Sequence, residues 1–155
     1  MNFNFSDYNR IIIVGNCGSG KSWLSKRISD LTGHSLFHLD KELWQPGWVM
    51  PSREEKIARQ KEMMSGEKWI IDGNYDSTME IRFAAADLVV FLDINRFGCL
   101  FSVMKRTGKK RSDLPDYLEE PKVFSKDFFR FLQINLVLSP KKSKNSDISA
   151  REISG

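Results

Sequence analysis

Residues 15–22 read Gly-Asn-Cys-Gly-Ser-Gly-Lys-Ser and match the phosphate-binding loop pattern G-x-x-x-x-G-K-[ST]. They follow the β-branched run at residues 11–14, which is typical of a buried parallel strand. They precede a segment in which the apolar residues Leu24, Ile28 and Leu31 recur at helical spacing, with Gly33 as a plausible stop. A strand, a glycine-rich turn and a helix in this order restrict the chain to an α/β fold built on a parallel sheet.

The loop composition predicts that the chain binds a nucleoside triphosphate. Glycines let successive backbone N–H groups approach phosphate oxygens without a Cβ in the way. The side chain of Lys21 is expected to reach the β- and γ-phosphates, and the hydroxyl of Ser22 to ligate Mg²⁺. We therefore expect ATP or another nucleoside triphosphate, with Mg²⁺, on the loop residues Gly15, Asn16, Cys17, Gly18, Ser19, Gly20, Lys21 and Ser22. The alternative is a glycine-rich turn without a ligand.

Composition places the chain among soluble globular proteins of one domain. It has 155 residues, of which 41% are hydrophobic and 28% charged. No apolar stretch approaches the roughly 20 residues needed to cross a bilayer, and the N-terminus lacks a signal-peptide pattern, so we expect a cytoplasmic protein and no membrane partner. Two cysteines without metal-ligand spacing agree with a reducing compartment. The net charge of +4 suits an anionic ligand but is too small to require nucleic acid.

Strand-like and helix-like segments alternate along the chain, which predicts a three-layer α/β/α fold with a parallel sheet of four or five strands. Further strands are expected at residues 35–39, 69–71 and 88–92, each followed by an aspartate. Helices are expected from the capping box of Ser52 and Glu55 to about Ser65, from near residue 76 to 86, and after Asn95. Residues 134–138 either form a short fifth strand or that strand is missing.

The second half of the chain is expected to be less regular. Residues 105–122 are dense in charge and contain glycine and proline, so we interpret them as a mobile flap. An amphipathic helix is expected to begin near Ser125. Residues 139–155 are mostly polar and are expected to be disordered, which leaves one domain over residues 1–138.

In an open parallel sheet, ligands bind at the carboxyl ends of the strands, where the phosphate loop and the strand-end aspartates converge. Asp72 is suited to hold Mg²⁺ directly or through water, as the partner of Ser22; its alternative role is to cap a turn. Asp40 is suited to accept a proton from an acceptor hydroxyl or to orient the acceptor; its alternative role is a helix cap. Asp93 is better explained as a cap. We therefore expect a catalytic role for Asp40 and a metal role for Asp72.

Phosphoryl transfer also needs cations to neutralise the transferred oxygens. Arg106 and Arg111 of the flap are the best candidates, because a guanidinium can hold two phosphate oxygens; the alternative is a solvated basic surface. Arg82 is a candidate to hold an anionic acceptor, against the alternative of a surface salt bridge. Trp44 and Trp48 could form an aromatic wall for an acceptor, although core packing under a loop is an equal alternative. His38 is interpreted as a strand residue and not a metal ligand.

With these residues in place, the chain resembles the adenylate-kinase-like branch of the P-loop NTPases, and more closely the FlaR-related DNA topology modulation proteins. The resemblance spans most of residues 10–130. The matching pieces are the strand and loop at 11–22, His-Leu-Asp at 38–40, Trp-Gln-Pro-Gly-Trp at 44–48, Trp-Ile-Ile-Asp-Gly-Asn-Tyr at 69–75 with Thr78 and Arg82, and Lys-Lys-Arg at 109–111 with Asp113. It implies an adenylate-kinase-like core, an acceptor-binding insertion at about 41–66 and a basic lid at about 105–122.

Three functions follow from these observations. The first is a Mg²⁺-dependent kinase that transfers the γ-phosphate of ATP to a small-molecule or nucleotide acceptor, with Lys21, Asp40, Arg106 and Arg111 as its catalytic residues. The alternative is a nucleotide-dependent protein that binds DNA or regulates its topology, in which the basic flap contacts phosphates. No recognisable DNA-binding motif supports this alternative. The third is a nucleotide binder without turnover.

Overall fold

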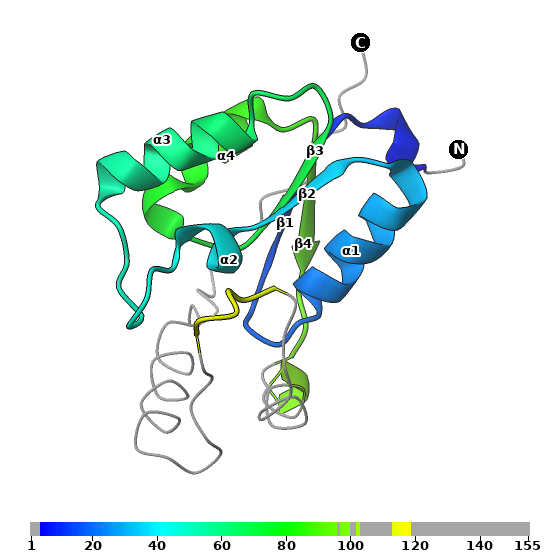
Figure 1. Cartoon of the computed structure of the whole chain (residues 1–155). Helices are drawn as coiled ribbons and strands as arrows, with labels where there is room; N and C mark the ends of the chain where they lie inside the picture. Colours follow the sequence, from blue (N-terminus) through cyan, green and yellow to red (C-terminus); the bar gives the residue numbers. More distant parts are fainter. Residues whose placement is uncertain (1–3, 96, 100–101, 103–112, 119–155) are drawn as a thin grey trace, which may run out of the picture.

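The structure is a computed structural model that describes residues 4–95, 97–99, 102 and 113–118 (Figure 1). Its centre is a sheet of four parallel strands, β1 (Arg10–Gly15), β2 (Ser35–His38), β3 (Trp69–Asp72) and β4 (Leu88–Leu92). Within this part of the chain the strand order is β2-β3-β1-β4. Ile12 of β1 pairs with Ile71 of β3 on one side and Val89 of β4 on the other. The expected parallel sheet is therefore confirmed, and the described residues contribute four strands to it.

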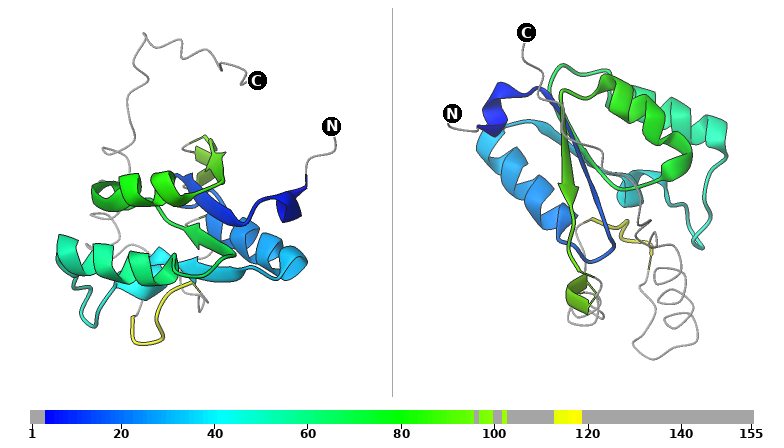
Figure 2. Two further views of the ribbon diagram at one scale, coloured as in Figure 1. Left: turned by 90° about the horizontal axis from the view of Figure 1, so that it is seen from above. Right: turned by 180° about the vertical axis from the view of Figure 1, so that it is seen from behind.

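Helices cover both faces of the sheet, as Figure 2 shows most clearly. Helix α1 (Lys21–Thr32) lies on one face, and α3 (Arg53–Met63) and α4 (Met79–Ala85) lie on the other. The short helix α2 (Leu39–Leu43) follows β2, and two single 3₁₀ turns, η1 (Phe5–Asp7) and η2 (Asp76–Thr78), precede β1 and α4. The three-layer α/β/α arrangement, with the loop between β1 and α1, confirms the expected P-loop type of fold.

The core consists of two apolar layers, one on each face of the sheet. On the α3 and α4 face, Ile12 and Ile71 pack with Leu39, Leu43, Met63 and Trp69. On the α1 face, Ile11, Ile13 and Ile70 pack with Ile28. Because both faces are covered, β1 and β3 need unbroken apolar runs, and Ile11, Ile12, Ile13, Ile70 and Ile71 are all fully buried.

Several element boundaries differ from the expectation. Strand β2 ends at His38 and not at residue 39, because Leu39 and Leu43 lie one helical turn apart on the buried side of α2. Asp40 therefore lies in the first turn of a helix. Helix α3 ends at Met63, earlier than expected, although its capping box is confirmed.

Other local expectations can also be compared with the structure. Asn95 caps the residues that follow it: its Oδ1 accepts the N–H of Gly98 at 2.8 Å. Gly33 ends α1 with a φ of 74°. Leu31 shares the helical spacing of Leu24 and Ile28, but it is 68% exposed. Fewer apolar residues of α1 therefore pack against the sheet than the spacing predicts.

Several predictions fall on residues outside the described part of the chain. These are the flap arginines Arg106 and Arg111, the helix near Ser125, the fifth strand at 134–138 and the polar tail at 139–155. Of the expected flap, the structure describes residues 113–118. None of the helices in the described ranges has the length and apolar character of a membrane span.

Candidate functional site

The predicted phosphate loop joins the carboxyl end of β1 to the N-terminus of α1. Gly15, Gly18 and Gly20 have φ values of 149°, 81° and 89°, in the region that favours glycine. A Cβ added to Gly15 would lie 2.6 Å from the carbonyl oxygen of Leu92 and 3.0 Å from the Leu92 Cβ. Only glycine therefore allows β1 to pass β4 this closely where the loop begins.

The side chain of Lys21 lies across its own loop. Its Nζ donates to the carbonyl oxygens of Gly15 and Asn16, at 2.7 and 2.9 Å. The ammonium group therefore lies at the N-terminus of α1, where the helix dipole and the backbone N–H groups already favour an anion. The contact of Lys21 with phosphate stays a prediction.

Residues that follow β3 and β4 hold the loop in place. Asn74 accepts the N–H of Gly15 on its Oδ1 at 3.1 Å, and Asn16 donates from its Nδ2 to the carbonyl of Ile94 at 3.4 Å. The N–H of Gly73 donates to the carbonyl of Ile13 at 3.2 Å. Sequence reasoning had not given Asn74 a role in the site, although it lies in the Asp-Gly-Asn-Tyr motif after β3.

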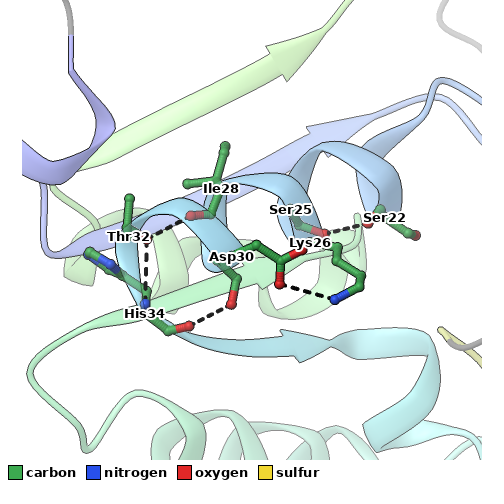
Figure 3. A network of polar contacts seen from close by, with 8 residues as sticks. Ser22, Ser25, Lys26, Ile28, Asp30, Thr32 and His34 are labelled. Atoms are coloured by element: carbon green, nitrogen blue, oxygen red, sulfur yellow. Dashed lines mark hydrogen bonds and ion pairs between the residues drawn. The ribbon is translucent and has the colours of Figure 1, made fainter.

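Asp72, at the end of β3, is 5% exposed and is held from two sides. Its Oδ2 lies 2.5 Å from the Oγ of Ser25 in α1 and 2.8 Å from the Nδ1 of His38 in β2. Ser25 Oγ also lies 3.1 Å from the carbonyl of Ser22 (Figure 3), but the shorter contact identifies Asp72 as the acceptor of its proton. Both hydrogen bonds fix the orientation of the Asp72 carboxylate beside the N-terminal half of α1.

His38 is a strand residue, as expected, but it is also the register partner of Asp72. Burial lowers the pKa of His38, while the hydrogen bond to Asp72 and the negative charges of Asp72 and Asp113 raise it; Lys41 opposes them weakly. The net effect raises the pKa above its ordinary value of 6.5. His38 therefore keeps a proton to a higher pH than a free imidazole and partly neutralises the two carboxylates.

Asp113 approaches the site from the segment at 113–118, drawn in yellow in Figure 1. Its Oδ2 accepts the hydroxyl of Ser22 at 2.6 Å, and the residue is 7% exposed. At the other end of this segment, the hydroxyl of Tyr117 donates to the carbonyl of Trp44 at 2.6 Å. The segment thus spans from the N-terminus of α1 to the loop after α2, and no sequence signal had predicted the contact with Ser22.

Three of the predicted acceptor residues, Asp40, Trp44 and Trp48, lie in α2 and in the loop that follows it. Asp40 accepts the hydroxyl of Tyr75 on its Oδ1 at 2.8 Å. Burial raises the pKa of Tyr75, and the charge of Asp40 and the hydrogen bond to it raise it further, so the phenol stays protonated and donates. Trp44 and Trp48 pack edge to face, with ring centroids 5.4 Å apart and planes at 73°. Trp48 has a φ of 59° and is 40% exposed, so a tight turn presents its ring to solvent.

Arg82 is placed neither at the predicted acceptor residues nor in a surface salt bridge. It is fully buried, and its guanidinium donates to the carbonyls of Gly73, at 2.7 Å, of Asn74, and of Tyr75, at 3.3 Å. Burial lowers the pKa of Arg82 to about 10, so the group remains charged at neutral pH. The surface salt bridge is therefore wrong, and the guanidinium is not brought to the acceptor residues because the loop carbonyls after β3 use its donors.

Two oxygen donors for Mg²⁺ lie near the N-terminus of α1. They are the Ser22 hydroxyl, which donates to Asp113, and the Asp72 carboxylate, which accepts from Ser25. The described residues contain no group of three or more His, Cys, Asp or Glu placed to hold a metal ion on their own. Since Mg²⁺ in nucleotide sites takes one or two protein oxygens and completes its shell with phosphates and water, this donor set fits Mg²⁺ that arrives with a nucleotide.

Comparisons with known proteins show a likeness to solved structures. No protein-family model matches the sequence, and no curated protein matches it. Among solved structures, the chain is similar to a deoxyadenosine kinase from M. mycoides, with the product dCMP and a flexible dCDP bound, at 18% identity and a TM-score of 0.42. The match covers 81% of this chain and 80% of that one.

Proposed function

We propose that the chain binds ATP, or another nucleoside triphosphate, on residues 15–22 with Mg²⁺ and transfers the γ-phosphate to a small-molecule or nucleotide acceptor. One observation carries this proposal: two consecutive residues connect the phosphate loop to the predicted acceptor residues. Asn74 accepts from the N–H of Gly15, and Tyr75 donates to Asp40. A phosphate on the loop and a hydroxyl at Asp40 would therefore lie on adjacent parts of one edge of the sheet.

Transfer of a phosphoryl group requires mainly positioning and neutralisation of charge. The loop amides and Lys21 would hold the phosphates, and Ser22 and Asp72 would hold Mg²⁺. Bound Mg²⁺ would supply neutralisation of the charge that develops on the phosphate oxygens. Arg106 and Arg111, which lie outside the described residues, are proposed to contact the transferred group.

Asp40 is the proposed base for the acceptor hydroxyl. Its Oδ1 accepts the Tyr75 hydroxyl, and this bond would hold the carboxylate in one orientation while it receives the acceptor proton. Trp44 and Trp48 would form the wall against which the acceptor packs. The DNA-binding alternative depends on basic residues at 105–111, and no observation in the described part of the chain favours it.

The proposal is tested by Mg²⁺-dependent release of ADP from ATP in the presence of nucleosides, nucleotides, sugars, small hydroxy acids and duplex DNA. We expect one small acceptor to stimulate release in the native chain. Lys21→Ala and Asp40→Asn should each reduce the stimulated rate at least about a hundredfold, the size of effect expected for a lost electrostatic or acid–base group. Retained transfer in Lys21→Ala, or stimulation by duplex DNA alone, would contradict the proposal.

A further inference from the structure

The hydroxyl of Ser22 has a carboxylate partner that its predicted role does not account for. The sequence pairs Ser22 with Asp72 as joint ligands of Mg²⁺, yet the hydroxyl of Ser22 donates to Asp113, at 2.6 Å. Asp72 instead accepts from Ser25 and contacts His38. Asp72 and Asp113 therefore accept hydrogen bonds from two different serines of α1, Ser25 and Ser22.

The hydrogen bond from Ser22 to Asp113 suits a hydroxyl that would ligate a metal and a carboxylate that would support it. A serine hydroxyl that ligates a cation gives the metal a lone pair, and its proton must then point to another acceptor. A carboxylate in that position fixes the rotamer of the hydroxyl and increases its electron density toward the metal. Asp113 Oδ2 occupies this position relative to Ser22 Oγ.

The surroundings of Asp113 keep it there. The residue is 7% exposed, and its neighbours Leu114 and Leu118 are buried as well. The hydrogen bond from Tyr117 to the carbonyl of Trp44 holds the far end of the segment against the loop after α2. The segment is thus held by burial around Asp113 and by the Tyr117 hydrogen bond at its far end, and Figure 1 shows it passing beside the phosphate loop.

We propose that Asp113 is a positioning residue that orients the Ser22 hydroxyl for Mg²⁺. This inference rests on the proposed function, since it concerns the metal that accompanies the nucleotide. It assigns to the segment at 113–118 a part in metal binding, beyond the basic lid that the resemblance implies for residues about 105–122. The same segment contacts the loop after α2 through the hydrogen bond from Tyr117 to Trp44, so it would connect the predicted acceptor residues with the metal site.

The test measures Mn²⁺ as a spectroscopic substitute for Mg²⁺, by electron paramagnetic resonance, in the full chain with saturating ADP. Asp113→Asn should weaken Mn²⁺ binding roughly 10- to 100-fold, the usual effect of losing a supporting group of a metal ligand. ADP affinity in EDTA should be unchanged. Asp116→Asn provides the matched control, because it removes the same charge from an exposed position of the same segment, and it should leave Mn²⁺ binding unchanged.

A second variant separates positioning from a general effect of charge. In a Ser22→Ala background the hydroxyl that Asp113 orients is absent, so adding Asp113→Asn should produce no further loss. Losses that multiply in the double variant would overturn the inference, as would Mn²⁺ affinity that is unchanged or tighter in Asp113→Asn. If the native chain binds no ADP, the proposed function fails and this inference fails with it. If it binds ADP and Asp113→Asn behaves as native, only the inference fails.

Discussion

His38 and Asp72 illustrate how one pair of side chains makes stability depend on pH. The pKa of His38 is raised in the folded protein because the hydrogen bond to Asp72 and the charges of Asp72 and Asp113 outweigh its burial. A raised pKa means that the folded state binds the proton more tightly than the unfolded state. The pair therefore contributes its full stability below about pH 6.5, and this contribution is lost as the pH rises through the higher pKa of the folded state.

We predict that the imidazole of His38, followed by NMR in EDTA, titrates above the ordinary histidine value of 6.5. Asp72→Asn should lower that pKa, because it removes the charged partner at 2.8 Å. A His38 pKa that is the same in both proteins would show that the contact with Asp72 does not control it.

The position of Gly15 has no room for a Cβ atom. Its φ of 149° is strained for other residues, and a Cβ would lie 2.6 Å from the Leu92 carbonyl. We predict that Gly15→Ala lowers the free energy of unfolding by about 2 kcal/mol or more. Gly66→Ala is the control, because a Cβ there meets nothing within 4 Å, and it should change stability by less than about 0.5 kcal/mol. Equal urea midpoints for the two variants would contradict the prediction.

The loop between β3 and η2 depends on the buried guanidinium of Arg82. Arg82 lies in α4 and donates to the carbonyls of residues 73–75, which connect the phosphate loop to the predicted acceptor residues. Arg82→Met would leave these carbonyls without their donor. We predict a loss of about 3 kcal/mol in urea unfolding, since each unsatisfied buried polar group costs about 1–3 kcal/mol.

Arg82→Lys separates charge from geometry in this loop. It keeps the positive charge but has no planar fork to reach three carbonyls, so it should be intermediate in stability. If Arg82→Lys is as stable as the native chain, the fork geometry does not matter and charge alone holds the loop. If Arg82→Met is also as stable, the loop does not depend on this residue.

The capping box of α3 predicts a smaller effect. Ser52 accepts the N–H of Glu55 on its Oγ at 3.2 Å, and Glu55 accepts the N–H of Ser52 at 2.9 Å. Ser52→Ala should cost about 1 kcal/mol in thermal or urea unfolding. The neighbouring substitution Glu54→Gln, which leaves both bonds intact, should cost less than about 0.5 kcal/mol. A smaller loss for Ser52→Ala than for Glu54→Gln would contradict the role of the box.

Helices and strands could be predicted where the sequence carries a short-range signal such as a capping box or a β-branched run. The capping box of α3 and the strand expected at residues 69–71 are both present, because capping and β-branched runs act over a few residues; β3 extends one residue further, to Asp72. The end of β2 was misplaced because Leu39 fits both a strand and a helix, and its burial against the core decided the outcome. The role of Arg82 was missed because a buried arginine and a surface arginine look alike in sequence.

For the whole molecule, the fold could be predicted further than the site. Continuous apolar strands alternating with helices indicate a parallel sheet before any contact is known, and the loop pattern locates the phosphate end of that sheet. The contacts that assemble the site join distant residues: Ser22 meets Asp113, and Ser25 meets Asp72. Such pairs leave no periodic signal, since their approach depends on how complete elements pack.

Isothermal titration of ATP with Mg²⁺ into the native chain tests whether residues 15–22 bind a nucleoside triphosphate. We predict saturable binding of one ATP per chain. Lys21→Ala should weaken it about tenfold or more, since a charged hydrogen bond contributes about 1.5–3 kcal/mol, while urea unfolding of the variant stays near that of the native chain. Absence of ATP binding, or equal ATP affinity in Lys21→Ala, would show that the loop does not hold the triphosphate through Lys21.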